Sequence, residues 1–304
     1  MKEVIQAMPY TEYIEKANVL IEALPYIRNF FEKIVVIKYG GSAMLEPQVR
    51  RSVLQDIVFM NYVGMRPILV HGGGPFINER LKEKNIQPEF KNGYRITSEE
   101  VMVVVEESLE KVNREIVQEI VTLGSSAISL SGKDDHLLET RRHPKIDSVD
   151  LGFVGEVKKV NTDILKKLVT SDIIPVISPV GIGTDGYAYN VNADVAAAEI
   201  ARVLKSLKFV LLTDTDGILR DQKAPDSLIS HIHPEEAEHL IKEGIISGGM
   251  IPKVRSCLRA MENGVRKAHI INGKIPHALL LEIFTDKGIG TEIVKKNEII
   301  KSHS

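Results

Sequence analysis

The chain has 304 residues, 43% of them hydrophobic, and its 39 basic residues nearly balance its 41 acidic ones. This length can bury the core of one large domain or two medium ones. A formal net charge of −2 excludes the strongly basic surface that is typical of proteins binding nucleic acids or acidic membranes, so we expect neither as a partner.

The cysteine count and the N-terminal residues indicate the compartment. Cys257 is the one cysteine, so no disulfide can form within the chain, as is typical of a reducing environment. Its place in a run with helical spacing predicts a small core residue. No apolar run reaches the roughly 18 residues of a transmembrane helix. The first residues, MKEVIQAMPYTEYIEK, lack the apolar block of a secretory signal, so we expect a cytoplasmic protein.

Residues 10–31 predict a helix ahead of the first strand. Apolar side chains recur there near helical spacing, at Ile14, Ala17, Ile21, Leu24 and Ile27. Pro25 predicts a kink. Such a helix either packs on its own domain or forms an arm that docks on another subunit.

Strands and helices alternate after this point. The expected strands are 33–39, 67–71, 126–132, 173–178, 208–213 and 267–272. The expected helices are 47–63, one ending near 85, 98–123, 193–205, 234–243, 250–263 and 276–283. The polar stretch 133–160 predicts loops and hairpins that lie outside the hydrophobic core. The alternation predicts a mostly parallel sheet between helices, and ligands of such sheets lie beyond the carboxyl ends of the strands.

The first strand ends in an unusual way, as IVVIKYGG. Lys38 interrupts a run that should be buried, and a buried ammonium group needs an anion beside it. Gly40 and Gly41 follow, and glycines let backbone N–H groups approach a ligand closely. This pattern predicts a cradle for a phosphate or carboxylate; the alternative is a tight turn with a lysine that reaches out to solvent.

The second strand ends in HGGGP, from His71 to Pro75. Proline at the expected start of a helix, after three glycines, predicts a helix N-terminus whose free N–H groups face outward and can bind an anion. A flexible turn is the alternative. Arg95, in KNGYRIT, could fork onto a carboxylate or lie on the surface.

Two later helix starts carry charges of interest. In YNVNAD, Asn190 and Asn192 share one face of an extended segment, and Asp194 lies in the first turn of a helix. A cap at Asn192 and simple dipole compensation at Asp194 are the plain alternatives. In SGGMIPKV, Lys253 stands beside the positive end of a helix dipole. An anionic ligand would resolve that misfit.

Other patterns are weaker. GIGTDG, from Gly181 to Gly186, matches the G-x-G-x-x-G pattern of a dinucleotide-binding loop. Such a loop must lead directly into a helix, but YAYNVNAD lies between GIGTDG and the next expected helix. It indicates a loop and hairpin. His231 and His233 lack the partners of a metal site, so no metal ligand is predicted. Phosphate-loop, zinc-protease and acyl-transfer motifs are absent from the sequence. Lysines, glycine-rich loops and one acid at strand ends favour phosphoryl transfer, which needs positioning and charge neutralisation above all.

The ordered set VIKYGG, VHGGGP, NGYRIT, NVNAD, LLTDTDGI and GGMIPKV resembles the amino-acid kinase family over about residues 31–295. The first helix and the tail HALLLEIFTDKGIGTEI resemble its arginine-inhibited, hexameric branch, which phosphorylates N-acetyl-L-glutamate. The resemblance implies a three-layer αβα sandwich around an open, mainly parallel eight-stranded sheet with an extra N-terminal helix. It also implies a division into an arm (1–30), an N-terminal lobe for the amino acid and dimerisation (31–206) and a C-terminal lobe for ATP and arginine (207–304).

The activity implied by the resemblance is ATP-dependent phosphorylation of the side-chain carboxylate of N-acetyl-L-glutamate, early in arginine synthesis. ATP with Mg²⁺ would be the co-substrate, with no permanently bound cofactor. Arginine would inhibit, and the assembly would be a homohexamer built as a trimer of dimers.

Residue roles follow from the same resemblance. Lys38 and Lys253 would contact the moving phosphoryl group from opposite sides, and Asp194 would orient both. The amino acid would meet Gly73, Gly74, Arg95, Asn190 and Asn192. Phosphate and ATP contacts would be Gly40, Gly41, Thr213, Asp214, Thr215, Asp216, Gly217, Ile218, Leu219, Ile245, Ile246 and Ser247. Arginine would meet Tyr13, His269, Glu282 and Gly288, although Glu282 could instead be a solvated helix residue.

Three other functions stay open. The substrate of the same fold could be aspartate, glutamate, carbamate or UMP. An oxidoreductase could use residues 181–186 for a nicotinamide cofactor, which requires a helix starting at Gly186. A catalytically silent arginine-sensing protein is the third, and Lys38, Asp194 and Lys253 argue against it.

Overall fold

The computed structural model describes residues 10–285 and 288–295. Residues 1–9, 286–287 and 296–304 lie outside the described part, and they include the beginning of the predicted arm and the end of the predicted C-terminal lobe. Among the described residues, none of the helices combines the length and hydropathy that a membrane span requires.

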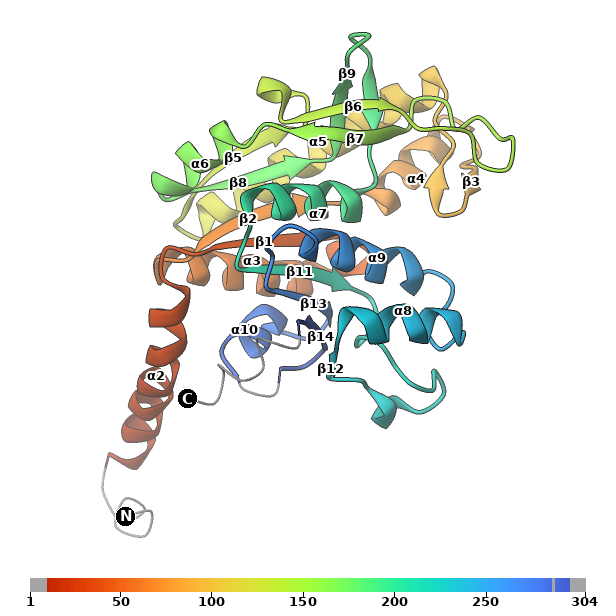
Figure 1. Cartoon of the computed structure of the whole chain (residues 1–304). Coiled ribbons are helices and arrows are strands. Elements are labelled where there is room, and N and C mark those ends of the chain that lie inside the picture. Colours follow the sequence, from red (N-terminus) through yellow and green to blue (C-terminus); the bar gives the residue numbers. More distant parts are fainter. Residues whose placement is uncertain (1–9, 286–287, 296–304) are drawn as a thin grey trace.

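An eight-stranded sheet forms the centre of the molecule (Figure 1). Its order is β12 (His231–Ile232), β14 (Thr291–Val294), β13 (Lys267–Asn272), β11 (Lys208–Thr213), β1 (Ile34–Tyr39), β2 (Arg66–His71), β8 (Ile173–Ser178) and β5 (Ser126–Ser131). All neighbouring pairs are parallel except β13 and β14. The predicted open, mainly parallel eight-stranded sheet is confirmed.

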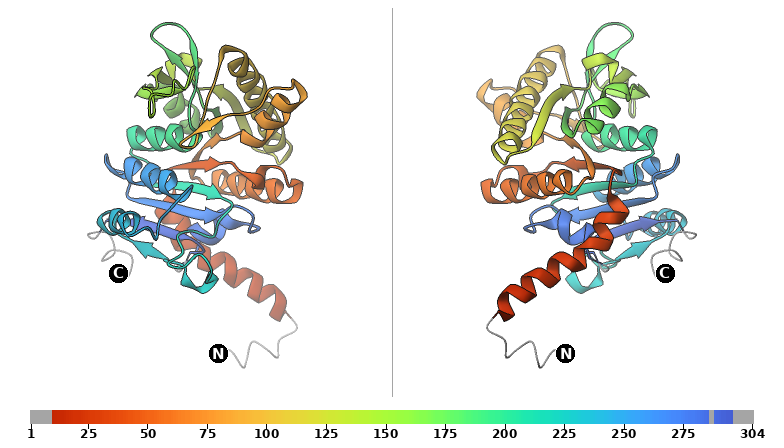
Figure 2. Two further views of the ribbon diagram at one scale, coloured as in Figure 1. Left: turned by 90° about the vertical axis from the view of Figure 1, so that its right-hand side faces the viewer. Right: turned by 90° about the vertical axis from the view of Figure 1, so that its left-hand side faces the viewer.

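Helices cover both faces of this sheet, which gives the predicted three layers (Figures 1 and 2). Side chains alternate along each strand, so Val36 and Leu211 pack toward one face while Val35 and Val210 pack toward the other. The first face holds α6 (Asp163–Thr170), α7 (Ala193–Leu204), α8 (Pro234–Lys242) and α9 (Met250–Met261). The second holds α3 (Pro47–Tyr62), α5 (Glu99–Thr122) and α10 (Ala278–Ile283).

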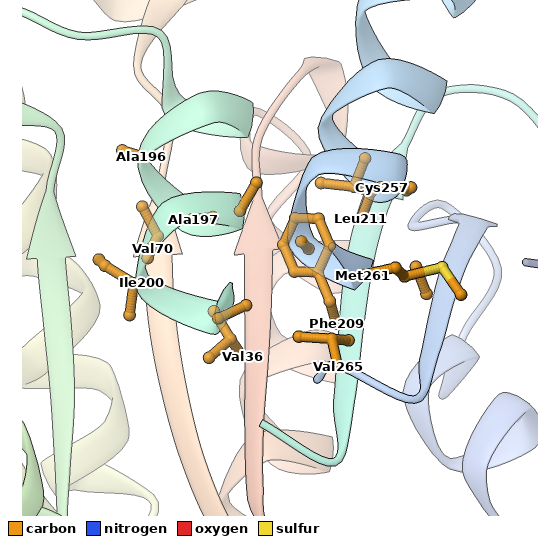
Figure 3. Packing of buried hydrophobic residues seen from close by; sticks show 14 of the residues in the cluster. Val36, Val70, Ala196, Ala197, Ile200, Phe209, Leu211, Cys257, Met261 and Val265 are labelled. Atoms are coloured by element: carbon orange, nitrogen blue, oxygen red, sulfur yellow. The ribbon is translucent and has the colours of Figure 1, made fainter. Parts of the chain in front are cut away.

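Small residues on α7 let it lie close to the sheet and to α9. Ala197, Ile200, Phe209, Leu211 and Cys257 belong to this packing, with Ile200 on the Val70 side of α7 (Figure 3). Cys257 is fully buried, as predicted. Burial raises the pKa of its thiol, with a further contribution from the Asp194 carboxylate.

A smaller sheet lies beyond β5 and β8 in the upper part of Figure 1, in the order β10 (Ala188–Asn190), β9 (Val180–Gly183), β6 (Leu138–Arg142) and β7 (Gly155–Val160). β9 and β10 pair antiparallel, so GIGTDG forms the predicted hairpin, and the next helix starts at Ala193. The helix at Gly186 that a dinucleotide site requires is therefore not formed. The expectation that residues 133–160 stay outside the core is wrong in part, because Leu137 and Leu138 are fully buried.

Short elements were not predicted. These are α6, β12, β14 and the hairpin of β3 (Phe90–Lys91) and β4 (Tyr94–Arg95), which follows α4 (Gly74–Glu83). Two-residue strands carry no readable alternation, and the eight residues of α6 span barely two helical turns. Tertiary contacts, rather than local patterns, define these elements.

Helix α2 (Thr11–Phe30) projects from the body of the molecule (Figures 1 and 2). It runs through Pro25 as one helix, and none of its residues is buried. Contacts occur at its C-terminal end, where the Tyr26 ring lies near Phe284 and the Lys208 ammonium lies over the Phe30 ring. Helix α2 therefore does not pack along its own domain.

Candidate active site

The site lies where three parallel strands end side by side. β1 is flanked by β2 on one side and β11 on the other. The chain leaves β1 toward β2 first and reaches β11 only much later, so the strand order reverses at β1. Ligands of open parallel sheets bind in the crevice outside the carboxyl ends of the strands at such a point. The predicted loops around Lys38, Gly72 and Asp214 all come to this edge.

Two lysines meet one carboxylate in this crevice. The Nζ of Lys38 lies 2.9 Å from Asp194 Oδ1, and the Nζ of Lys253 lies 3.3 Å from Asp194 Oδ2. Lys38 comes from β1, Asp194 from the first turn of α7, and Lys253 from the first turn of α9. The structure thus brings together the three residues that the sequence singled out as catalytic.

The charges in this cluster are unbalanced. The Asp194 side chain is only 12% exposed, and burial alone would raise its pKa. The ammonium groups of Lys38 and Lys253 outweigh burial and hold the pKa of Asp194 at about 2. One carboxylate thus faces two ammonium groups and the N-termini of two helices, so the crevice favours an additional anion.

Gly40 and Gly41 have no side chain and so leave space for the charged groups that lie against them. A Cβ at Gly40 would lie 2.6 Å from Lys38 Nζ, so glycine leaves room for the ammonium group. Gly41 has φ 83° and a Cβ there would lie 2.7 Å from Asp214 Oδ2. Asp214 in turn accepts hydrogen bonds from the backbone N–H of Ser42 (3.1 Å) and its hydroxyl (2.8 Å). Asp214 therefore ties the loop after β11 to the loop after β1.

His71 orients the next glycine loop, a role that the sequence did not reveal. Its Nδ1 lies 2.8 Å from the carbonyl oxygen of Gly72. A carbonyl can only accept, so Nδ1 carries the proton. Burial lowers the pKa of His71 to about 4, which keeps the ring neutral. Because C=O and N–H point in opposite directions across a trans peptide, holding the Gly72 carbonyl directs the Gly73 N–H away from His71.

A cavity of about 280 Å³ adjoins the lysine–aspartate cluster. Lys38 and Asp194 form part of its wall. All five predicted amino-acid contacts also line it, namely Gly73, Gly74, Arg95, Asn190 and Asn192. Gly72, Ile77, Leu109 and Val154 complete much of the remaining wall. A small, partly apolar ligand with anionic ends would fit this lining.

Arg95 is a buried cation in the cavity wall. Arg95 is only 7% exposed. Its Nη2 donates to Asn78 Oδ1 (2.6 Å), and its guanidinium lies over the Phe90 ring, 4.7 Å from the centroid. Nη1 has no hydrogen-bond partner, and no carboxylate of the described residues pairs with Arg95. The surface alternative is therefore wrong, and the guanidinium is oriented for an anion.

The two asparagines differ in how much they can offer a ligand. Asn192 caps α7, because its Oδ1 accepts from the N–H groups of Asp194 (2.9 Å) and Val195 (3.2 Å). The capping alternative is thus confirmed for Asn192, which leaves only its Nδ2 to donate to a ligand. Asn190 donates through Nδ2 to Thr97 Oγ1 (3.2 Å) and also lines the cavity, and its Oδ1 has no such capping role.

The predicted nucleotide contacts come from the end of β11, the loop that follows it and the segment before α9. Thr213 ends β11 and residues 214–219 follow it. Gln222 Nε2 donates to Ser247 Oγ (3.3 Å), which joins the chain after β11 to the segment before α9. Ile218 and Ile246 are buried. Their backbone N–H groups already donate, to Thr291 Oγ1 (2.8 Å) and to the Leu240 carbonyl (3.1 Å). Asp216 accepts from Asn272 Nδ2 (2.7 Å). The remaining residues of this set are Thr213, Thr215, Gly217, Leu219 and Ile245, and their contact with ATP stays a prediction.

The residues predicted to bind arginine differ in how far they are buried. Glu282 is 6% exposed, so the solvated alternative is wrong. Its carboxylate lies 2.6 Å from His269 Nδ1 and accepts from the N–H groups of Ile289 (2.7 Å) and Gly290 (3.2 Å). Burial would raise the pKa of Glu282, but the His269 bond and the other polar contacts lower it. Gly288 lies against this carboxylate, whereas Tyr13 lies exposed on α2.

The His71 ring predicts a pH effect on stability. Its pKa is lower in the folded state (about 4) than the ordinary value of 6.5, so its contribution is complete above pH 6.5 and is lost as pH falls toward 4. His71→Asn keeps a donor for Gly72 but cannot titrate. Between pH 7 and pH 5, wild type should lose about 2 kcal/mol more unfolding free energy than this variant. Urea denaturation at several pH values measures the unfolding free energy of both proteins. If this free energy fell equally with pH in wild type and variant, the titration of His71 would not contribute to stability.

Comparison with known proteins agrees with this geometry. Residues 33–272 match the model of the amino acid kinase family. An acetylglutamate kinase from Petrotoga mobilis is 50% identical over 293 residues, which cover 96% of this chain and 97% of that protein. A structure of N-acetylglutamate synthase from Neisseria gonorrhoeae, complexed with coenzyme A and N-acetyl-glutamate, superimposes with a TM-score of 0.82 at 27% identity. The alignment covers 92% of this chain but only 63% of that one.

The same synthase complexed with coenzyme A and L-arginine gives a TM-score of 0.79 at 26% identity, with 92% of this chain and 65% of that chain covered. The fold, the ordered motifs at the strand ends and the full-length match to acetylglutamate kinases point to one group of proteins. The chain therefore belongs to the amino acid kinase family, and within that family to the acetylglutamate kinases.

Proposed function

We propose that the protein transfers the γ-phosphoryl group of ATP to the side-chain carboxylate of N-acetyl-L-glutamate, an early step of arginine synthesis in the cytoplasm. The contact of Lys38 and Lys253 with the single carboxylate of Asp194 carries this proposal. It places two ammonium groups where a phosphoryl group with growing negative charge would pass. The chain's place among the acetylglutamate kinases supports the choice of substrate.

The chemistry needs no general base. A carboxylate is already ionised at pH 7, so its oxygen attacks the γ-phosphorus directly. The bond between that phosphorus and the β,γ-bridging oxygen breaks, and ADP leaves with the electron pair. Asp194 stays ionised because its pKa is about 2, so it orients Lys38 and Lys253 and accepts no proton from the substrate.

In the proposed binding mode the amino acid occupies this cavity. Its α-carboxylate would pair with the unmatched guanidinium of Arg95, and its acetamido group would lie near Asn190. The side-chain carboxylate would then reach toward Lys38 and the N–H groups of residues 72–74. The nucleotide would approach from the Lys253 side, so the first part of the chain (31–206) would hold the amino acid and the second (207–304) would hold ATP.

Mg²⁺ fits this site mainly as part of the nucleotide. The two carboxylates nearest the crevice are already engaged, Asp194 by two lysines and Asp214 by Ser42. Mg²⁺ prefers oxygen ligands and keeps several waters, so phosphate oxygens and water would supply most of its shell. When bound, the ion would neutralise charge on the phosphates of ATP.

A coupled ADP-release assay tests the proposed function. N-acetyl-L-glutamate is compared with L-glutamate, L-aspartate, carbamate and UMP at equal concentrations, with ATP and Mg²⁺ in excess. The proposal expects the highest kcat/KM for N-acetyl-L-glutamate, because it matches both ends of the cavity. Faster turnover of another acceptor would assign the enzyme to that substrate, and no turnover at all would favour the non-catalytic alternative.

Removing either cluster lysine should abolish most of the catalysis. We expect Lys38→Ala and Lys253→Ala each to lower kcat by about 10²–10³, as removal of a preorganised donor to developing charge does in other enzymes. Lys133→Ala is the matched control, because that lysine also has a carboxylate partner (Glu106, 2.5 Å) but lies outside the cavity. Turnover at the wild-type rate in either cluster variant would remove that lysine from the mechanism.

Arg95 should act on substrate binding. Arg95→Ala should raise KM for N-acetyl-L-glutamate roughly 10- to 100-fold with a smaller change in kcat, since a charged hydrogen-bonded pair is lost in both ground and transition states. Arg95→Lys should not restore KM, because lysine lacks the planar fork. KM for ATP serves as the internal control and should not change. If KM for the amino acid did not change, Arg95 would not be a residue that binds its α-carboxylate.

We also propose that α2 docks on a second copy of the chain, giving a hexamer built as a trimer of dimers that arginine inhibits. The helix exposes large apolar side chains, including Val19, Leu20 and Ile21, that a monomer would leave in water. The buried His269–Glu282 pair lies in the second half of the chain, near the C-terminal end of α2. The synthase structure with bound L-arginine supports an arginine site on this fold.

Deleting residues 1–27 tests the role of α2. The truncated protein should keep its kinase activity, lose assembly beyond the dimer and become less sensitive to arginine, because the docking surface is gone. Sedimentation velocity and arginine titration measure the two effects. Leu20→Asp should act in the same way by burying a charge in the contact. A truncated protein that still sediments as a hexamer would contradict the proposal.

A further inference from the structure

Two helices meet at the active site and run on side by side. α7 and α9 pack against each other on one face of the sheet (Figures 1 and 3). Asp194 is in the first turn of α7 and Lys253 is in the first turn of α9. The distance between their charged groups therefore depends on how α9 is placed along and around α7.

A second ion pair connects the same two helices farther from the cavity. Glu199 of α7 is only 5% exposed. Its Oε1 accepts from Arg259 Nε of α9 at 2.7 Å. Its Oε2 accepts from Nε (2.9 Å) and Nη2 (2.7 Å) of Arg202, which lies on α7 itself. One carboxylate thus has one partner across the helix contact and one partner within its own helix.

The remaining contact between α7 and α9 is largely apolar. Ala197 and Cys257 are among the small side chains in this packing (Figure 3). Apolar burial stabilises such a contact but is non-directional. A hydrogen-bonded guanidinium–carboxylate pair is directional and fixes the orientation of both groups. The Glu199–Arg259 pair is therefore the contact best suited to set the relative placement of the two helices.

The spacing supports this role. Glu199 follows Asp194 by five residues and Arg259 follows Lys253 by six. At 1.5 Å per residue, these are roughly 7.5 Å and 9 Å along the respective helix axes. The two ion pairs therefore anchor the helices at two separate points, which restricts both translation and rotation of α9.

We propose that Glu199 and Arg259 are positioning residues that hold α9 against α7 so that the Lys253 ammonium group reaches Asp194 and the phosphoryl group. This inference rests on the proposed phosphoryl transfer for its effect on rate. Its structural content, the place of Lys253 relative to Asp194, does not depend on the identity of the substrate.

The surroundings of Arg259 argue against a mainly stabilising role. Its side chain is 51% exposed and also donates to Glu262 through Nη1 (2.8 Å). If Arg259 is removed, Glu199 keeps both hydrogen bonds from Arg202, so no buried carboxylate is left unpaired. Half-exposed ion pairs contribute little to stability. Arg202 supplies a matched control, because it contacts the same carboxylate without crossing between helices.

Kinetics of paired variants test the proposal. Arg259→Met should lower kcat about 10-fold with little change in KM for N-acetyl-L-glutamate, since small displacements of catalytic groups reduce rate steeply. Arg202→Met should turn over at nearly the wild-type rate. Arg259→Lys should restore part of kcat through a single hydrogen bond. Thermal unfolding of each variant checks that its fold is retained. Equal kcat in Arg259→Met and wild type would overturn the proposal.

A double-mutant cycle separates positioning from general damage. Once Lys253 is replaced by alanine, Arg259 has nothing left to position, so Lys253→Ala and Lys253→Ala/Arg259→Met should have the same kcat. If Arg259→Met lowered kcat by the same factor in the Lys253→Ala variant as in wild type, the proposal would be overturned. A crystal structure of Arg259→Met gives an answer that does not depend on activity: the ammonium group of Lys253 should move away from Asp194. An unchanged contact would refute positioning, whereas an inactive wild type would refute only the proposed function.

Discussion

One buried carboxylate, Asp194, holds two ammonium groups in place, and the rest of the structure serves this contact. A carboxylate buried alone would become protonated, and a buried lysine alone would tend to lose its proton. Here the ammonium groups of Lys38 and Lys253 keep Asp194 ionised, and the two lysines outnumber the one carboxylate. An anion that passes between the lysines is thus stabilised by groups that are already oriented and need no rearrangement.

The sheet and its helices explain how residues so far apart in sequence meet. β1 brings Lys38 to the carboxyl edge of the sheet, and the starts of α7 and α9 bring Asp194 and Lys253 to the same edge. Loop contacts such as Ser42–Asp214 keep the strand ends together. The cavity with Arg95 adjoins this cluster, because Lys38 and Asp194 form part of its wall.

Much of this arrangement could be predicted from local patterns, because buried parallel strands are continuous apolar runs and their carboxyl ends share an edge. That reasoning located Lys38, residues 72–74 and Asp194 correctly. It missed interactions whose partners are distant in the chain: Ser42 and Asp214 are 172 residues apart, and Glu199 and Arg259 are 60 apart. The burial of Glu282 has no signal in its own helix, because its partners lie outside that helix, at His269 and at the N–H groups of Ile289 and Gly290.

The most direct test is a crystal structure of the protein with ADP, N-acetyl-L-glutamate and aluminium fluoride, a mimic of the phosphoryl group in transit. The account predicts that the fluoride group lies between the two lysines. Both ammonium groups should donate to it while Asp194 still accepts from both. A fluoride group bound in the crevice with Lys38 or Lys253 turned away from it would contradict the central claim.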